Sequence, residues 1–250
     1  MMLLQAKNLQ KRFGAIEALH DVSLTLRRHE ILAIVGESGS GKSTLLGVLS
    51  GRERPDAGTV LYHGAPISEL GELGLRKLQR SRWGYIHQDP RQALRLSVSA
   101  GGNIGERLMA AGNRHYGKIR ETAGHWLEAV EIDPARLDDY PRHFSGGMMQ
   151  RLQIAATLVT GPELVFMDEP TGGLDVSVQA RILDLIRTLV RGLGLAVVLV
   201  THDIGVARLL ADRLVVMRRG EIVEQGLTDQ VLDDPHHEYT QLLVSSVLPA

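Results

Sequence analysis

The segment GESGSGKS, from Gly36 to Ser43, has the composition and spacing of a loop that binds phosphate. Its glycines let backbone N–H groups approach a phosphate where side chains would clash, and Lys42 supplies charge to the β- and γ-phosphate oxygens. The hydroxyl of Ser43 is a suitable ligand for Mg²⁺. An ordinary glycine turn is the alternative, but a buried-strand pattern precedes the segment and a helical pattern follows it, which favours a phosphate loop. The residues expected to contact a nucleotide here are Gly36, Glu37, Ser38, Gly39, Ser40, Gly41, Lys42, Ser43 and Thr44.

Two adjacent carboxylates, Asp168 and Glu169, follow the apolar run LVFM. Ligands of parallel sheets gather at the carboxyl ends of strands, so both acids are expected to face the loop around Lys42. Asp168 is predicted to hold Mg²⁺ through water, and Glu169 to accept a proton from the attacking water. On their own, the two acids are better explained as a strand-end turn closed by Pro170. The phosphate loop makes the functional interpretation the stronger one.

His202 follows a second apolar run, LAVVLV, within the short sequence THD. Taken alone, a histidine here is more often a strand-end residue with satisfied hydrogen bonds than a catalytic residue. Beside a phosphate loop and two carboxylates, it is predicted to sense the γ-phosphate. The predicted catalytic residues are therefore Lys42, Glu169 and His202, and the predicted reaction is phosphoryl transfer to water.

Buried strands separated by helices are the elements that would position these residues. Residues 2–35 alternate in short runs typical of strands and hairpins, and the run EILAIV is apolar throughout, as in a strand buried on both faces. Helices between such strands predict a parallel α/β sheet with right-handed crossovers. One of these helices is predicted to turn a single apolar face toward the sheet, formed by Ile182, Leu185, Ile186 and Leu189.

Two further segments have distinct patterns. Residues 69–130 are dominated by Arg, Lys, Glu, Leu and Ala, which predicts a mainly helical insert. The sequence RLVVMRRGEIVEQG predicts a hairpin that turns at Arg219-Gly220. GGNIG (101–105) resembles a second phosphate loop, but no buried strand precedes it, and a loop at the entry to a helix is the better interpretation.

The composition excludes several classes of function. The chain has 250 residues, no cysteine and a net charge of -1, so disulfides, thiolate metal sites and cysteine nucleophiles are excluded. Its bulk charge indicates neither a nucleic-acid partner nor an anionic membrane. The start, MMLLQAKNLQK, becomes polar too soon for a signal peptide, and no apolar run is long enough to span a bilayer. A cytoplasmic protein without direct membrane insertion is expected.

The segment HFSGGMMQRL places Ser145, Gly146 and Gly147 at the start of a mostly apolar run. A hydroxyl and two glycine N–H groups at a helix N-terminus suit phosphate binding, because that end of a helix is electropositive and glycine allows close approach. No lysine follows, unlike in the loop at 36–43. The segment therefore looks like one half of a phosphate site whose lysine comes from elsewhere.

The phosphate loop, HFSGGMMQR, VFMDEPTGGLD and VTHD occur in the order found in ATP-binding cassette (ABC) ATPases, and the chain resembles that family over nearly its whole length. The resemblance implies ATP hydrolysis, with ATP and Mg²⁺ as ligands. It also implies that Ser145, Gly146 and Gly147 complete the ATP site of an opposite subunit. The expected assembly is therefore a homodimer joined by ATP.

The family's other motifs match single residues of this chain. Phe13 in KRFG matches the aromatic residue that stacks on adenine, with a core phenylalanine as the alternative. Gln88 matches the glutamine that reaches Mg²⁺, so the expected metal ligands are Ser43, Gln88 and Asp168. Asp175 matches an aspartate that crosses the dimer interface.

The chain departs from the family pattern at two places. Met148 stands where the family usually has glutamine, which puts any side-chain contact from that position to the nucleotide in doubt. Gly172-Gly173 replaces the common Ser-Ala pair, so that loop is expected to be more pliable.

The resemblance implies an α/β fold of the ABC-type P-loop NTPase, with a mostly parallel RecA-like sheet, an N-terminal antiparallel β subdomain and a helical subdomain. A single domain is expected over residues 1–250. Its expected parts are a nucleotide-binding core (1–88 and 162–225), a helical subdomain (89–161) that contains the family's signature segment, HFSGGMMQR, and a helical C-terminal tail (226–250).

Within the family, residues 97–132, the signature region and the tail resemble the ATP-binding subunits of bacterial carbon–phosphorus lyase systems, which act in phosphonate metabolism. The implied partners are the lyase core subunits. Whether a second ABC protein also joins the assembly is left open. The tail also resembles oligopeptide-importer ATPases, which is the main alternative. A third interpretation is a clamp in which ATP only gates assembly, and Glu169 argues against it.

Basic residues cluster in and before the insert, which indicates either a solvated helix face or a surface for docking a partner. Trp83 and Tyr116 are the aromatic residues that would join such a surface. The basic residues are Arg76, Lys77, Arg80, Arg82, Arg91, Arg95, Arg107, Arg114, Lys118 and Arg120.

Overall fold

The computed structural model describes residues 1–246, and the last four residues of the expected C-terminal tail, 247–250, lie outside that range. The chain folds as two compact units. The first unit combines Met1–Arg76 with the segment that begins at Gly194, and the second unit is Lys77–Leu193.

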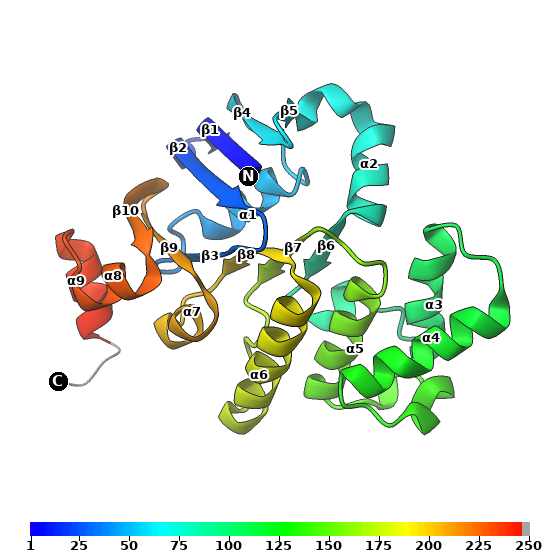
Figure 1. Ribbon diagram of the computed structural model, residues 1–250. Helices are drawn as coiled ribbons and strands as arrows, with labels where there is room; N and C mark the ends of the chain where they lie inside the picture. The colour runs from blue at the N-terminus through cyan, green and yellow to red at the C-terminus, as the bar shows by residue number, and fades with distance from the viewer. Residues whose placement is uncertain (247–250) are drawn as a thin grey trace. The chain divides into compact units, whose positions relative to one another are not determined.

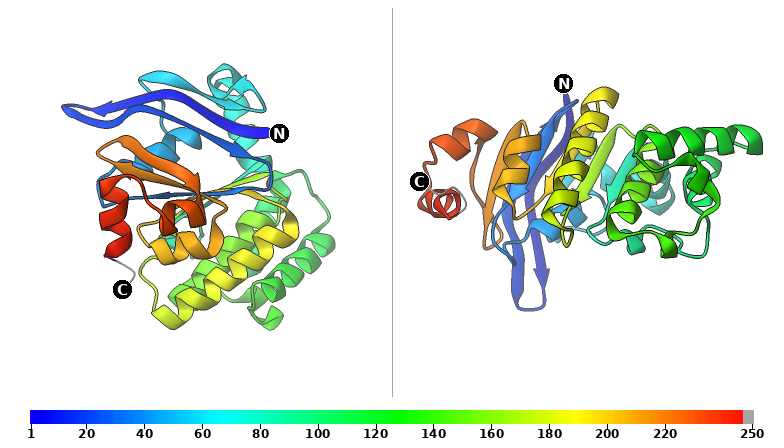
Figure 2. Two further views of the ribbon diagram at one scale, coloured as in Figure 1. Left: turned by 60° about the vertical axis from the view of Figure 1, so that its left-hand side comes forward. Right: turned by 90° about the horizontal axis from the view of Figure 1, so that it is seen from below.

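The first unit contains an antiparallel sheet in the order β2-β1-β4-β5. Figure 2 shows its first two strands as a long two-stranded ribbon. Leu4, Ala6 and Leu9 of β1 are buried, while the polar residues between them are partly or fully exposed, as in a sheet with one apolar face. This confirms strands in residues 2–35, but the sequence patterns did not predict the shorter β4 and β5. The bounds are β1 (Met2–Phe13), β2 (Ile16–Arg27), β4 (Ala57–Tyr62) and β5 (Ala65–Pro66).

The first unit also contributes four strands in the order β10-β9-β3-β8. β3 pairs in parallel with both β8 and β9, and every residue of β3 and β8 is buried, which confirms the two apolar runs as buried strands. β10 is antiparallel to β9, and the predicted turn at Arg219-Gly220 is confirmed by left-handed φ angles of 48° and 83°. The bounds are β3 (Ile31–Val35), β8 (Ala196–Val200), β9 (Arg213–Arg218) and β10 (Glu221–Leu227).

Short helices accompany these strands. α1 follows the phosphate loop directly, as predicted, and α7 begins after β8, where Asp203 caps its N-terminus. α8 and α9 follow β10 and lie beside it (Figure 1). α2 crosses the boundary between the two units. The bounds are α1 (Lys42–Leu49), η1 (Ile67–Leu70), α2 (Gly71–Ser81), α7 (Ile204–Leu210), α8 (Thr228–Asp233) and α9 (Glu238–Ser245).

The second unit is mainly helical but also contains β6, which runs parallel to β7. α3 packs against α4 and α5, and α5 also packs against α6 (Figure 1). On α6, Ile182, Leu185 and Ile186 are buried as predicted, and Leu189 is half-buried. The bounds are β6 (Trp83–Ile86), η2 (Pro90–Gln92), α3 (Ala100–Ala110), α4 (Tyr116–Ala129), η3 (Pro134–Asp138), η4 (Pro141–His143), α5 (Gly146–Leu158), β7 (Leu164–Asp168) and α6 (Val176–Leu193).

Two details of this unit differ from the sequence interpretation. Residues 101–105 lie inside α3 and do not form an entry loop, because the helix is capped earlier by Ser99. A Cβ at Gly101 would lie 2.6 Å from Leu137, so the glycine allows η3 to pack closely. Trp83 is 4% exposed and packs edge-on against Phe166, so it belongs to the core and not to a docking surface.

Among residues 1–246, no helix combines the length and apolar character needed to cross a membrane.

Candidate functional site

The phosphate loop joins β3 to α1 through backbone conformations that only glycine adopts easily. Gly36 has φ 152° and Gly41 has φ 103°. A Cβ at Gly36 would lie 2.2 Å from the carbonyl oxygen of Met217, and one at Gly41 would lie 2.5 Å from the carbonyl oxygen of Ala18. Neighbouring backbone therefore approaches the loop too closely for any side chain at either position.

Lys42 is held inside this loop. Its side chain is buried, and Nζ donates hydrogen bonds to the carbonyl oxygens of Gly36 at 2.9 Å and Glu37 at 2.7 Å. The loop thus wraps around its own ammonium group and keeps it at the N-terminus of α1, where anions bind favourably. Ser43, in the first turn of α1, is exposed.

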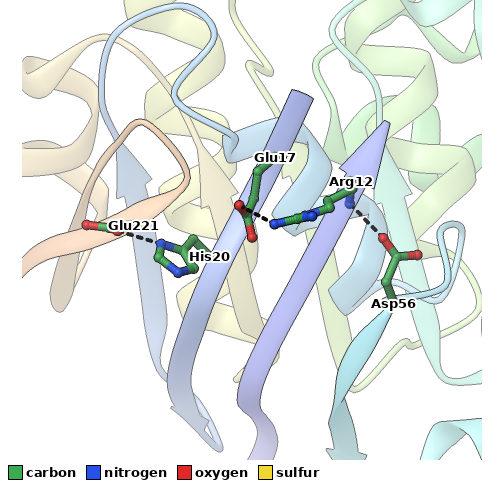
Figure 3. Close-up of polar contacts among 5 residues, drawn as sticks. All are labelled: Arg12, Glu17, His20, Asp56 and Glu221. Atoms are coloured by element: carbon green, nitrogen blue, oxygen red, sulfur yellow. Dashed lines mark hydrogen bonds and ion pairs between the residues drawn. The ribbon is translucent and has the colours of Figure 1, made fainter. Parts of the chain in front are cut away.

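The β9–β10 turn supports the same loop from the side. The N–H of Gly220 donates to the carbonyl of Ser40 at 2.9 Å, and the carbonyl of Gly220 accepts the N–H of His20 at 2.9 Å. Figure 3 shows a third link in this region, the contact between Nδ1 of His20 and Glu221 at 2.7 Å. The hairpin predicted from Arg219-Gly220 therefore connects β2 to the phosphate loop, a role that the turn pattern did not indicate.

Phe13 ends β1 and is 48% exposed, so it is not a core phenylalanine. The hairpin that carries it is fixed by Arg12, whose side chain pairs with Glu17 at 2.9 Å and whose N–H donates to Asp56 at 2.7 Å (Figure 3). The N–H of Arg12 is the main cause of a lowered pKa of Asp56, and Lys11 adds to it. An exposed ring on a braced hairpin can stack on a planar ligand.

His202 follows β8 and is exposed. The residues on either side of it are ordered. The N–H of Thr201 donates to the carbonyl of Ile34 on β3 at 3.2 Å, and Asp203 accepts from the N–H groups of Gly205 and Val206 at the start of α7. The histidine is thus held between the end of a buried strand and a capped helix.

In the second unit, Glu169 and Gln88 are in direct contact. Nε2 of Gln88 donates to Oε2 of Glu169 at 3.2 Å. Glu169 directly follows β7 and has φ 42°, a left-handed conformation that is uncommon for a residue with a side chain and occurs often at active sites. Asp168, the last residue of β7, is half-buried. The structure thus brings together two of the residues predicted from separate motifs.

The loop after Glu169 is shaped by the same glutamine. A Cβ at Gly172 would lie 2.7 Å from Nε2 of Gln88, and Gly173 has φ 75°. These glycines give room for the Gln88 side chain and a left-handed turn. Asp175 follows and is exposed, and its carbonyl accepts the N–H groups of Val178 and Gln179 at the start of α6.

Ser145 is the N-cap of α5, and its Oγ accepts the N–H of Met148 at 3.3 Å. Ser145 and Gly146 are exposed, whereas a Cβ at Gly147 would lie 2.6 Å from Val178. The side chain of Met148 lies against Arg136, whose Nη1 donates to Sδ at 3.4 Å.

Two residues that the sequence analysis missed hold the segment before Gln88. Gln153 accepts the N–H of His87 at 3.0 Å and donates to its carbonyl at 3.0 Å, and Gln150 donates to the same carbonyl at 3.3 Å. Both glutamines are 1% exposed. Two glutamines three residues apart in an apolar helix were the available signal, because buried amides need partners. α5, which Ser145 caps, therefore fixes the residue next to Gln88.

Each unit carries part of the predicted site. The phosphate loop, Phe13 and His202 belong to the first unit, and Gln88, Ser145 to Gly147, Asp168, Glu169 and Asp175 belong to the second. A family sequence model described as ABC transporter matches residues 19–172, more than half of the chain. The chain belongs to this ABC family. The names of similar ABC proteins therefore indicate which activities to consider for it.

One similar ABC protein, from Escherichia coli K12, is PhnK, whose name describes ATP binding in phosphonates utilization. It is 63% identical over 246 residues, which cover 98% of each chain. A Brucella ovis protein named for ATP binding in peptide import is 36% identical over 97% of this chain and 76% of its own length.

The fold is also similar to those of solved ABC structures. The structure of cbiO1 from Clostridium perfringens, part of the ABC transporter complex cbiONQ, matches with a TM-score of 0.84 and 28% identity over 99% of this chain and 96% of its own. A dimeric ATP-binding cassette in a post-hydrolysis state, bound to ADP and phosphate, matches with a TM-score of 0.81 and 30% identity over 90% of this chain and 99% of its own. The predicted α/β ABC fold is confirmed, and the chain is an ABC ATPase that binds ATP.

Proposed function

We propose that this ABC ATPase is the ATP-binding and ATP-hydrolysing subunit of a phosphonate carbon–phosphorus lyase complex in the cytoplasm. The observation that supports this most strongly is the 63% identity to PhnK over 98% of both chains, against 36% to the peptide-import relative. The proposed partners are the lyase core subunits, with or without a second ABC protein. The proposed organisation is a single domain that comprises a nucleotide-binding core, a helical subdomain and a C-terminal tail.

The proposed ATP site uses the residues predicted from the motifs. Lys42 and the N–H groups of the phosphate loop bind the phosphates, and Phe13 stacks on the adenine. Glu169 accepts the proton of the attacking water, and His202 contacts the γ-phosphate. The hydrogen bond from Gln88 to Glu169 supports this role, because it orients the carboxylate that acts as base.

The residues proposed to hold Mg²⁺ offer the hard oxygen donors that this ion prefers: a hydroxyl from Ser43, an amide from Gln88 and a carboxylate from Asp168. Their chemistry fits the ion. When bound, Mg²⁺ neutralises charge on the phosphate oxygens. The donors come from the start of α1, the segment after β6 and the end of β7.

We further propose that two copies of the chain enclose ATP, with Ser145, Gly146 and Gly147 of one copy facing the phosphates held by Lys42 of the other. The likeness to a dimeric cassette bound to ADP and phosphate supports this arrangement. The exposed serine and glycine at the start of α5 support it too, because they leave the electropositive end of a helix open to an anion.

Copurification separates this function from that of an oligopeptide importer, which the 36% identity to the peptide-import relative keeps as the second candidate. The tagged full chain is purified from phosphate-starved cells, once without detergent and once after detergent extraction. The proposal predicts coelution with soluble lyase subunits identified by mass. Coelution with a permease only in the detergent extract would contradict it and support the importer.

A further inference from the structure

The C-terminal tail reaches the phosphate loop through one hydroxyl group. Tyr239, in the first turn of α9, is 7% exposed. Its Oη accepts the N–H of Glu37 at 3.0 Å, across 202 positions of sequence. The contact lies within the first unit, and none of the motifs discussed above includes this tyrosine.

The N–H that Tyr239 accepts belongs to the same peptide group as the carbonyl that holds Lys42. The carbonyl of Gly36 accepts from Nζ of Lys42 at 2.9 Å, and the N–H on the other side of that peptide bond is the one bound by Tyr239. Hydrogen bonds at the two ends of one peptide group polarise and strengthen each other. Gly36 has no side chain to restrict rotation about its Cα–C bond, the rotation that would turn this peptide. The two hydrogen bonds therefore fix its orientation.

Tyr239 is itself held on several sides. The guanidinium of Arg218, at the end of β9, lies over the Tyr239 ring at 4.9 Å. The backbone N–H of Tyr239 donates to Nδ1 of His237 at 3.0 Å. Glu224 on β10 accepts the N–H groups of His236 and His237 at 2.9 and 3.1 Å. The hydroxyl is thus presented to the loop by an ordered support.

We propose that Tyr239 is a positioning residue for ATP binding: it fixes the Gly36–Glu37 peptide, which in turn holds the ammonium group of Lys42 at the phosphate site. This inference rests on the proposed role of Lys42. Without the hydroxyl, the N–H of Glu37 loses its acceptor and the peptide can rotate away from Lys42. The bound phosphates then meet a lysine that is less well preorganised, which weakens binding more than it slows the chemical step.

The test is Tyr239→Phe, which removes the hydroxyl and keeps the ring under Arg218. ATPase kinetics with Mg²⁺ give KM and kcat, and thermal unfolding gives Tm. We expect KM to rise about two- to tenfold, as for the loss of one hydrogen bond, with kcat within about twofold and a fall in Tm of no more than about 4–8 °C. Tyr140→Phe is the matched control, because Arg142 lies over that ring at the same 4.9 Å, and its KM should equal the wild-type value.

Each other outcome overturns the inference. An unchanged KM in Tyr239→Phe shows that the hydroxyl does not position the loop. A loss of activity that follows a large drop in Tm shows a purely structural role, and a lower kcat at constant KM places the effect on the chemical step. If the wild-type chain neither binds nor hydrolyses ATP, the proposed function fails, whereas a normal wild type with an unaffected variant rejects only the role of Tyr239.

Discussion

The two glutamines of α5 should control ATP turnover through the segment before Gln88, and Gln153→Leu is the perturbation that tests this. Leucine is close to glutamine in size but cannot accept the N–H of His87 or donate to its carbonyl. Gln150 still donates to that carbonyl, but its own Oε1 loses the hydrogen bond from Nε2 of Gln153 at 3.2 Å, so a partly buried N–H and a buried amide oxygen each lose a partner. Such a loss costs about 1–3 kcal/mol.

For a domain of this size, about 2 kcal/mol corresponds to a fall in Tm of about 4–8 °C. The ATPase rate should fall as well, because a displaced His87 moves its neighbour Gln88, which contacts Glu169. We expect kcat to fall more than KM changes, since Glu169 is proposed to act in the chemical step. The assays are thermal unfolding and steady-state ATPase kinetics.

The control is Gln10→Leu, the same substitution at an exposed position of β1, which should leave both Tm and kcat near wild type. If Gln153→Leu matches this control in both measurements, the glutamine contacts neither stabilise the fold nor position Gln88.

Two further changes test other contacts. Gly172→Ala should lower kcat about tenfold, equivalent to about 1.4 kcal/mol on the barrier, because the new Cβ would lie 2.7 Å from Nε2 of Gln88 and displace it. The control is Gly124→Ala, where a Cβ meets nothing within 4 Å. Equal kcat values for the two variants would argue against the effect. Burial by itself raises the pKa of Glu224, but its hydrogen bonds, including those from His236 and His237, leave that pKa below its usual range. The ionised Glu224 therefore stabilises the fold above its unfolded pKa, and this stabilisation is lost as pH falls through the lower folded pKa. Between about pH 6 and pH 3, the Tm of Glu224→Gln should fall less than the Tm of the wild type. Parallel curves of Tm against pH for the two proteins would contradict this.

The sequence predicted the elements whose residues share one local pattern. β3 and β8 are apolar throughout, and the glycines of the phosphate loop and of the Arg219-Gly220 turn located both features, where the structure then shows positive φ angles. β6 was missed because its four residues, WGYI, lie between charged helical stretches. Because so short a strand gave no sign of burial, Trp83 was considered for a docking surface, whereas it lies in the core.

The contacts that complete the candidate site were harder to predict because they join distant residues. Nothing near Tyr239 indicates that its partner is Glu37, and nothing near Gln153 names His87. Hydrogen bonds of this kind depend on which backbone groups the fold leaves without a strand or helix partner, and that is known only once the elements are assembled. The motifs indicated the residues proposed for the chemistry, and the structure added those proposed to orient them.

Two copies of the chain are proposed to enclose ATP, and the variant Glu169→Gln gives the sharpest test of this arrangement. This variant keeps every proposed phosphate contact and removes the base, so it should bind ATP, hydrolyse it slowly and accumulate as a dimer. Molecular mass is measured by light scattering after gel filtration, with and without ATP and Mg²⁺, and Ser145→Arg in the same background is the control that should remain monomeric. We expect the mass to double only when ATP and Ser145 are both present. A variant that binds ATP yet keeps the mass of one chain, or one that hydrolyses ATP at the wild-type rate, would contradict it.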